Sequence, residues 1–237
     1  MPYKKSFSRK EFDSAARGLT RSAKYVSLKK NKVPNEVAQC VYRNLVFQTS
    51  AALEQYVKTV LDDWVYLLKI NDKKAFNLPE NLISLIRIKK LTPTFQGYIS
   101  RAKGEKETIK NLSEINALNE CFLDHADVNS IMDVGNLIDD KKYPSKSNLI
   151  DLFYRFGILN IFDECGRKGK RDFKSILNSF SDVRTQISHE HPIPDLTHSD
   201  VKKHSENISR FVHSIDKVLY SKVVSVSGEE CWKTDLM

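Results

Sequence analysis

An arginine and a histidine with spacing suited to phosphodiester chemistry stand in the last third of the chain. Arg184 and His189 are separated by four residues, and His191 and Pro192 follow closely. Histidine titrates near neutral pH and can act as a general base or acid. Arginine stays charged and can bind phosphate oxygens through two N–H groups. RNA carries its own nucleophile, the 2′-hydroxyl, so such a pair could cleave RNA without a metal ion.

The helix expected to carry this pair spans about residues 171–188, because Pro192 and Pro194 forbid its continuation. At about 100° per residue, Arg184 and His189 lie about 140° apart around the helix axis. They reach one cleft only if the helix end unwinds at His189 or if a second helix end completes the site. The alternative is that both side chains simply cap the helix C-terminus, where cations are favoured.

Other chemistry has less support in the sequence. Five of the six histidines fall between residues 189 and 213. A metal site built from His189, His191 and His198 is conceivable, but no second ligand cluster has recognisable spacing, so we predict no metal and no cofactor. Cys165, beside Gly166 in a basic stretch, is expected to have a lowered pKa, yet no base is paired with it in sequence. Nucleotide-cradling loops and the common hydrolase motifs are absent from the sequence.

The elements that must position these residues are predicted to be helices. Only 8 glycines and 7 prolines occur among 237 residues, and apolar residues recur three or four apart, which predicts an all-α fold. Helices are expected over about residues 8–30, 35–68, 79–93, 106–125, 148–156, 171–188 and 198–221.

Several residues mark where these helices begin or end. Ser8 with Glu11, and Thr197 with the acid three residues later, have the spacing of a capping box. Pro34 suits a first turn, and Gly157 suits a helix end. Pro93 is expected to interrupt its helix. The stretch from 127 to 147 is expected to be loop with one short helix.

Positive charge is concentrated at the N-terminus. The net charge is +8, and residues 1–32 hold ten Lys and Arg against only Glu11 and Asp13, which accounts for the whole excess. Localised positive charge attracts phosphate backbones, although an ordinary solvated basic helix would show the same composition. The candidate nucleic-acid-binding residues are Lys4, Lys5, Arg9, Lys10, Arg17 and Arg21, with a second cluster at Arg167, Lys168, Lys170 and Arg171.

Composition also bounds the protein class. The four cysteines form no CxxC pair, no secretory h-region opens the chain, and no apolar run approaches the roughly 18 residues of a membrane span. We therefore expect a cytoplasmic protein that does not bind membranes. Its predicted divisions are a basic N-terminal arm (residues 1–33), a helical domain (34–221) and a loose tail (222–237).

With these elements in place, the sequence resembles the HEPN superfamily, whose hallmark is R-x(4–6)-H at the end of a helix in an all-α bundle. Residues 41–58, which contain Leu53-Glu54-Gln55-Tyr56, resemble an earlier helix of that family. Residues 149–158 resemble the segment before the motif helix in proteins encoded near toxin–antitoxin and phage-defence genes. The nearest group is RiboL-PSP-HEPN, and the resemblance covers about residues 36–220.

This resemblance implies a HEPN-like bundle of long antiparallel helices with an extra N-terminal basic helix. It also implies a metal-independent endoribonuclease that acts as a toxin or phage-defence effector. Two copies would form one composite cleft, and an antitoxin or another defence-system protein would be a partner. Arg184 would bind the scissile phosphate and His189 would act on the 2′-hydroxyl or the leaving oxygen, giving a 2′,3′-cyclic phosphate. The possible supporting residues are Glu54, Thr185, Ser188, Glu190 and His191.

Thr185 departs from the family pattern. The family often has asparagine or another polar residue directly after the arginine, and threonine keeps a hydroxyl but lacks the amide. This leaves two alternatives open: a non-catalytic HEPN-type module that binds nucleic acid or protein, and a helical adaptor with no nucleic-acid role.

Overall fold

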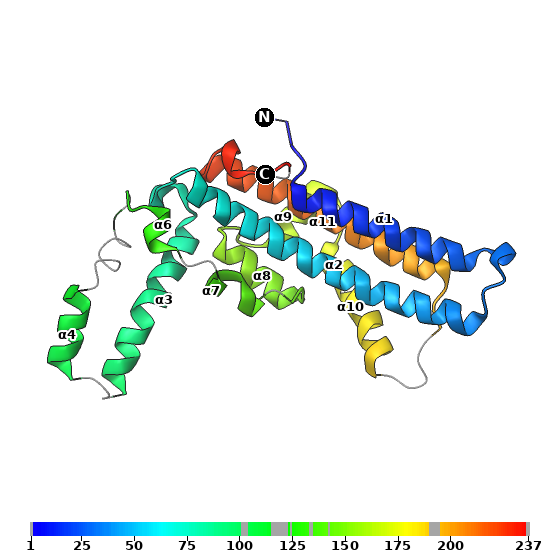
Figure 1. Ribbon diagram of the computed structural model, residues 1–237, viewed down its shortest axis with the longest axis horizontal. Coiled ribbons are helices and arrows are strands. Elements are labelled where there is room, and N and C mark those ends of the chain that lie inside the picture. The colour runs from blue at the N-terminus through cyan, green and yellow to red at the C-terminus, as the bar shows by residue number, and fades with distance from the viewer. Residues whose placement is uncertain are drawn as a thin grey trace.

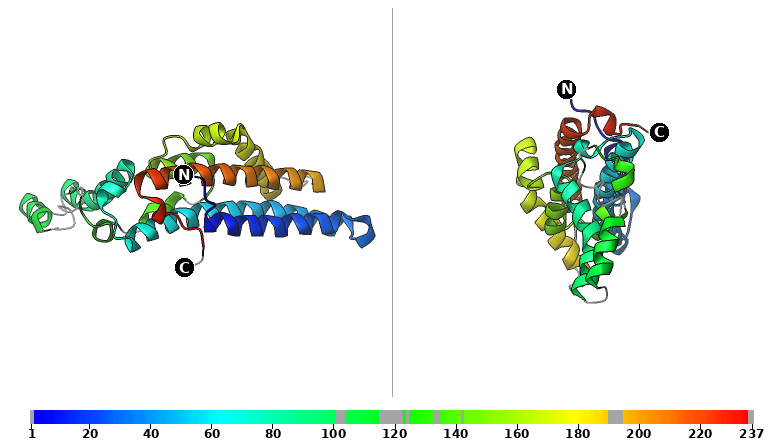
Figure 2. Two further views of the ribbon diagram at one scale, coloured as in Figure 1. Left: turned by 90° about the horizontal axis from the view of Figure 1, so that it is seen from above. Right: turned by 90° about the vertical axis from the view of Figure 1, so that its left-hand side faces the viewer.

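Three long helices form the centre of the protein (Figures 1 and 2). The computed structural model describes residues 2–100, 104–114, 123, 125–132, 135–141, 143–189 and 195–235. Helices α1 (Phe7–Ser27), α2 (Asn35–Ile70) and α11 (His198–Val226) lie side by side, with α1 antiparallel to the other two. Within the described ranges the chain forms helices and turns with one isolated β-bridge, which confirms the all-α prediction.

Two of the three long helices, α1 and α11, begin at capping side chains. Thr197 caps α11 and exchanges bonds with Asp200 as a capping box, as predicted. The prediction for α1 is wrong by two residues, because its N-cap is Ser6, whose hydroxyl accepts a hydrogen bond from the Arg9 backbone N–H at 3.0 Å. Ser8 instead donates to Asp63 on α2 at 2.9 Å. A tertiary partner therefore decides which serine caps the helix.

A second layer of helices covers α2 and α11. It consists of α8 (Lys146–Arg155), α9 (Ile161–Gly169) and α10 (Phe173–His189). The rings of Phe162 and Phe173 stack on Phe211 of α11 at centroid distances of 5.5 and 5.3 Å, which ties α9 and α10 to the central bundle. Gly157 has a φ of +76° at the end of α8, as a helix-terminating glycine should.

Helices α3 (Glu80–Ile99) and α4 (Glu105–Glu114) extend away from the bundle (Figure 1). The expected break at Pro93 is wrong, since α3 continues through it. The helix expected to reach residue 125 is also wrong at its end, because 123 and 125 are not helical, while 115–122 lie outside the described residues.

Short elements connect these helices. A 3₁₀ turn (Ala75–Asn77) precedes α3, and the stretch predicted to hold one short helix contains α6 (Val128–Ile131), α7 (Gly135–Ile138) and a 3₁₀ turn (Asp139–Lys141).

The segment after residue 222 is not a loose tail. Helix α11 continues to Val226, and a 3₁₀ turn follows over Glu229–Cys231. Trp232 is buried and donates from Nε1 to the Lys4 carbonyl at 2.9 Å, and the Phe7 backbone N–H donates to the Lys233 carbonyl at 2.9 Å. The two described ends of the chain therefore pack against each other (Figure 1).

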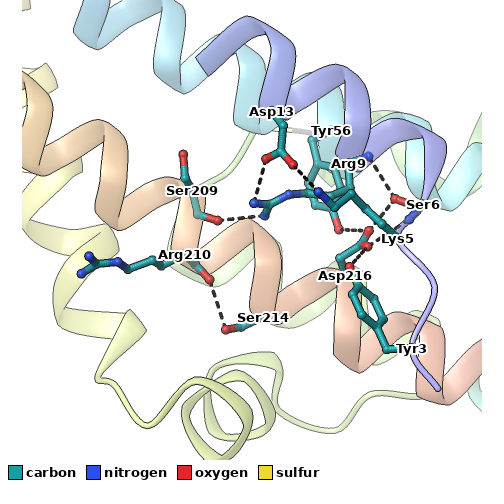
Figure 3. Close-up of polar contacts among 10 residues, drawn as sticks. All are labelled: Tyr3, Lys5, Ser6, Arg9, Asp13, Tyr56, Ser209, Arg210, Ser214 and Asp216. Atoms are coloured by element: carbon teal, nitrogen blue, oxygen red, sulfur yellow. Dashed lines mark hydrogen bonds and ion pairs between the residues drawn. The ribbon is translucent and has the colours of Figure 1, made fainter. Parts of the chain in front are cut away.

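A buried carboxylate holds the N-terminal segment in place (Figure 3). Asp216 of α11 is fully buried and accepts hydrogen bonds from the hydroxyls of Tyr3 (2.5 Å), Ser6 (2.5 Å) and Tyr56 (3.0 Å) and from the Ser6 N–H (3.1 Å). Burial, followed by the Asp216 charge, raises the pKa of both tyrosine hydroxyls. Four donors thus satisfy one charge that would otherwise be costly to bury.

Candidate functional site

Helix α10 carries both residues of the predicted motif. It begins two residues later than expected, after Asp172, whose carboxylate accepts the Ser175 backbone N–H at 3.0 Å. Its buried side chains, spaced four, three and seven residues apart, are Phe173, Leu177, Phe180 and Ile187. Arg184 lies four residues after one of them and three before the next, so it belongs to this inward face.

The Arg184 side chain packs between two aromatic rings. Its guanidinium carbon lies 5.1 Å from the centroid of the Tyr143 ring and 5.9 Å from that of Phe47 on α2. One terminal N–H donates to the Tyr143 hydroxyl. Its Nε is buried and has no hydrogen bond in the part of the chain that the structure describes.

No carboxylate within the described ranges forms an ion pair with Arg184, although this side chain is half-buried. A partly desolvated cation normally gains a counter-charge when it is buried. The aromatic rings supply part of that stabilisation through cation–π contact. The Arg184 guanidinium can therefore accept a phosphate as its counter-ion.

His189 is the last residue of α10 and is exposed. The helix does not unwind before it, so His189 stays about 140° away from Arg184 around the axis. Figure 1 shows this end of α10 projecting from the bundle. One copy of the chain therefore does not bring the two side chains together, and the route to a shared cleft is a second helix end.

The predicted supporting residues fall into three groups. Thr185 and Ser188 are exposed on α10, and the Ser188 hydroxyl donates to the Arg184 carbonyl at 2.9 Å. Glu54 is half-buried on the same face of α2 as Phe47, two turns further on, and no hydrogen bond or ion pair joins it to Arg184. Glu190 and His191 lie outside the described residues.

Sequence reasoning missed three residues near the motif. Phe47 and Tyr143 both contact the arginine, and Arg43 lies one turn before Phe47 on α2. Arg43 contacts Asp195 at 3.4 Å and also has a buried Nε without a partner in the described residues. The Arg43–Phe47 spacing of four was visible in the sequence, whereas nothing in it connected Tyr143 to this helix.

Much of the predicted basic N-terminal surface is engaged within the protein. Lys4 pairs with Glu229 (2.7 Å), Lys5 with Asp13 (2.9 Å) and Lys10 with Asp235 (2.8 Å). Arg9 is buried, pairs with Asp13 (2.8 Å) and donates to the Ser209 carbonyl (2.8 Å). Arg17 and Arg21 are exposed on the later half of α1.

The second basic cluster lies at the opposite end of α10 from His189, about 25 Å away along the helix. Lys168, Lys170 and Arg171 are exposed, and Arg167 pairs with Glu164 at 2.5 Å. This cluster is therefore separate from the motif within one copy of the chain.

The cysteines and histidines provide no additional centre in the described ranges. The lowered pKa expected for Cys165 is wrong, because burial raises the pKa of its thiol. Burial likewise raises the pKa of Cys231 to about 11. No group of three or more His, Cys, Asp or Glu side chains is placed to hold a metal ion among the residues that the structure describes. Nor does any helix there have the length and apolarity required to span a membrane.

Comparison with known proteins identifies the family. The model of the RiboL-PSP-HEPN family matches residues 19–221, from the middle of α1 almost to the end of α11. Comparison with curated proteins and with solved structures gave no match. The match covers most of the described helices, including the motif helix α10. The chain belongs to the RiboL-PSP-HEPN family and is a HEPN-type all-α module.

Proposed function

We propose that this protein is a metal-independent endoribonuclease that cleaves RNA in a composite site formed by two copies of the chain. The observation that carries the proposal is the half-buried Arg184 guanidinium, oriented by Phe47 and Tyr143 and without a carboxylate partner in the described residues. HEPN modules are often ribonucleases, and the exposed His189 completes the R-x4-H motif.

The proposed reaction is an internal transesterification. Arg184 binds the non-bridging oxygens of the scissile phosphate and stabilises the charge that builds on them. The 2′-oxygen forms a bond to phosphorus while the bond from phosphorus to the 5′-oxygen breaks. An imidazole takes the 2′-proton or protonates the 5′-oxygen. The products are a 2′,3′-cyclic phosphate and a 5′-hydroxyl, and the atoms balance without a water molecule or a metal ion.

The geometry of α10 supports the proposed dimer. Because His189 points away from Arg184 on its own helix, a two-fold pair of projecting α10 ends would bring the arginine of one copy toward the histidine of the other. Solution mass tests this directly: we expect about twice 27.3 kDa.

The catalytic claim is tested by substitution. Arg184→Ala and His189→Ala should each reduce cleavage of a single-stranded RNA by at least about 100-fold while leaving the helical circular dichroism unchanged. The exposed His125 supplies a matched control, since His125→Ala removes an imidazole away from α10. EDTA should have no effect on the wild-type rate.

We further propose that the activity serves as a toxin or phage-defence effector, held in check by an antitoxin or another defence-system protein. The family resemblance supports this role. Induced expression of the wild type should arrest bacterial growth, and Arg184→Ala should relieve the arrest.

A second candidate is a non-catalytic module that binds RNA. It is favoured by the separation of Arg184 and His189 on α10 and by Thr185 after the arginine. Wild-type protein that binds single-stranded RNA but leaves it intact would support this candidate and contradict the nuclease.

A further inference from the structure

A groove lined by charged and small side chains lies between α1 and α11, apart from the α10 motif. It has a volume of about 530 Å³, within the range of about 300–1,000 Å³ typical of ligand sites. Its walls come from the middle of α1 (residues 13–21) and the earlier half of α11, which run side by side (Figure 2). Figure 1 shows the end of α10 projecting from a different side of the bundle.

Three arginines line this groove: Arg17 and Arg21 from α1 and Arg210 from α11. Arg17 and Arg21 are exposed and have no ion pair with any carboxylate in the described ranges. Arg210 approaches Glu206 only at 4.0 Å, at the limit of an ion pair. Three arginines therefore line one groove, and among the described residues only Arg210 has a carboxylate neighbour, at the limit of an ion pair.

The acidic residues that line the groove already have cationic partners within the protein. The Asp13 carboxylate forms ion pairs with Lys5 at 2.9 Å and with Arg9 at 2.8 Å, so these two cations already balance its negative charge. Although burial alone would raise it, these two cations hold the pKa of Asp13 below its usual value. Glu206 is shared between Arg210 and Lys202, which lies 3.8 Å away.

The remaining lining consists of small side chains, Ala16 and three hydroxyl residues. The Ser205 side chain lines the groove, the residue is only 6% exposed, and its hydroxyl has no hydrogen bond within the described residues. Thr20 and Ser209 add two further hydroxyls, and no aromatic side chain of the described residues lines the groove. Arginines with hydroxyls fit phosphate oxygens, whereas bases are normally held by aromatic stacking.

We propose that the α1–α11 groove binds the sugar–phosphate backbone of single-stranded RNA, independently of its base sequence. The inference rests on the proposed function, because a nuclease of this family would meet RNA as its substrate. The groove is formed by only two helices and has a volume of about 530 Å³, which suits one strand rather than a duplex. The proposed RNA-binding surface is thus formed by two helices. Ion pairs within the protein engage the other basic residues of the N-terminal segment, which are Lys4, Lys5, Arg9 and Lys10.

The test measures binding separately from cleavage. The probe is a fluorescent single-stranded 2′-O-methyl RNA, which lacks the free 2′-hydroxyl that cleavage requires. The Arg17→Ala/Arg21→Ala double variant should bind it about tenfold more weakly, and the slope of log affinity against log salt should become shallower by about 1.4. Arg210→Ala should weaken binding in the same direction.

The matched control is Lys106→Ala/Lys110→Ala, which removes two exposed cations with the same spacing from α4. Its affinity should stay within about twofold of wild type. Equal losses of affinity in the two double variants would overturn the proposed RNA binding in the groove, because they would show that any loss of positive charge weakens binding. Displacement of the probe by a mononucleotide as effectively as by unlabelled oligonucleotide would also overturn it, in favour of a nucleotide site.

The two proposals fail separately. Wild-type protein that cleaves no RNA, with an Arg17→Ala/Arg21→Ala variant that still loses affinity for the probe, would support RNA binding in the groove and contradict the nuclease. Cleavage that depends on Arg184 and His189, with an Arg17→Ala/Arg21→Ala variant that binds like wild type, would support the nuclease and contradict RNA binding in the groove.

Discussion

Tyr143 orients the Arg184 guanidinium by two separate contacts, its ring and its hydroxyl. Tyr143→Phe keeps the ring and removes the hydrogen bond. A hydrogen bond to a charged group contributes about 1.5–3 kcal/mol, so we expect RNA cleavage to slow about tenfold or more. Single-turnover rates with saturating protein provide the measurement.

The stability of this variant is the control. Tyr143 is 41% exposed, so the thermal midpoint of Tyr143→Phe should match that of wild type. Tyr143→Ala removes the ring as well and should slow cleavage further. An unchanged rate in Tyr143→Ala would show that the tyrosine does not position the arginine.

Asp216 is the residue whose replacement should destabilise the fold most clearly. An asparagine has nearly the same shape but presents an NH₂ group to hydroxyls that now donate to Asp216. We expect Asp216→Asn to lower the free energy of unfolding by about 3 kcal/mol in chemical denaturation. Asp182→Asn, at an exposed position of α10, should change it by less than about 0.5 kcal/mol.

At the residue scale, the sequence identified the motif but not its surroundings. Arg184 and His189 could be selected because their chemistry and spacing are local. Tyr143 and Phe47 could not, because they come from distant parts of the chain and meet only in the folded protein. The same reason explains why Ser8 was mistaken for the cap of α1: the competing bonds of Ser6 and Ser8 reach α11 and α2.

Among the elements, helices with a clear apolar period and a cap were predicted well. Helix α2 begins after Pro34 as expected, and α11 begins at the Thr197 capping box. The prediction of α3 was wrong at a proline, where the rule that proline ends a helix does not hold. Pro93 was taken as a helix breaker, yet α3 continues through it because a proline costs a helix one hydrogen bond without forbidding it.

Pro93→Ala should therefore stabilise α3. A proline in a helix interior costs up to about 3 kcal/mol relative to alanine. The later half of α3 lies outside the main bundle (Figure 1), so the gain should be local. Native-state hydrogen exchange should show slower exchange of α3 amides, with little change in the global unfolding midpoint.

The neighbouring residue supplies a control for this experiment. Thr92 lies on the same turn of α3, and Thr92→Ala changes helix propensity by less than about 0.7 kcal/mol. Protection in Pro93→Ala that does not exceed that in Thr92→Ala would mean that the proline imposes no cost on the helix.

For the whole molecule, stability should depend on pH through two histidines of α11. Burial lowers the pKa of His204 and of His213 from 6.5, so the folded protein favours their neutral forms. The unfolded chain binds protons more readily below about pH 6.5, and stability is lost as the pH falls through that value. The free energy of unfolding should be lower at about pH 5.5 than at about pH 7.5.

A double variant isolates this effect. His204→Gln/His213→Gln should flatten the dependence between these two pH values. The Asp13 ion pairs cannot mimic it, because a carboxyl with a lowered pKa loses its contribution only below about pH 4. The same slope in the variant and the wild type would exclude both histidines as the cause.

The overall architecture was predictable to the level of fold class and family. Scarce glycine and proline together with helical periodicity predicted the all-α fold, and the R-x4-H motif suggested the family; the family match over residues 19–221 confirms the family. The tail was misjudged because Trp232 is buried and bonds to Lys4, at the opposite end of the chain. Such contacts have no local signature.

The meeting of residues 2–7 with residues 220–233 has a practical consequence for engineering. Tyr220 donates to the Pro2 carbonyl at 3.0 Å, beside the bonds of Lys4 and Phe7 to the last turn. A short flexible linker could therefore connect these two segments, and new ends could be opened at the exposed Leu159 between α8 and α9. Such a circular permutant should keep the helical core, and it would free the surface around the original ends for fusion partners.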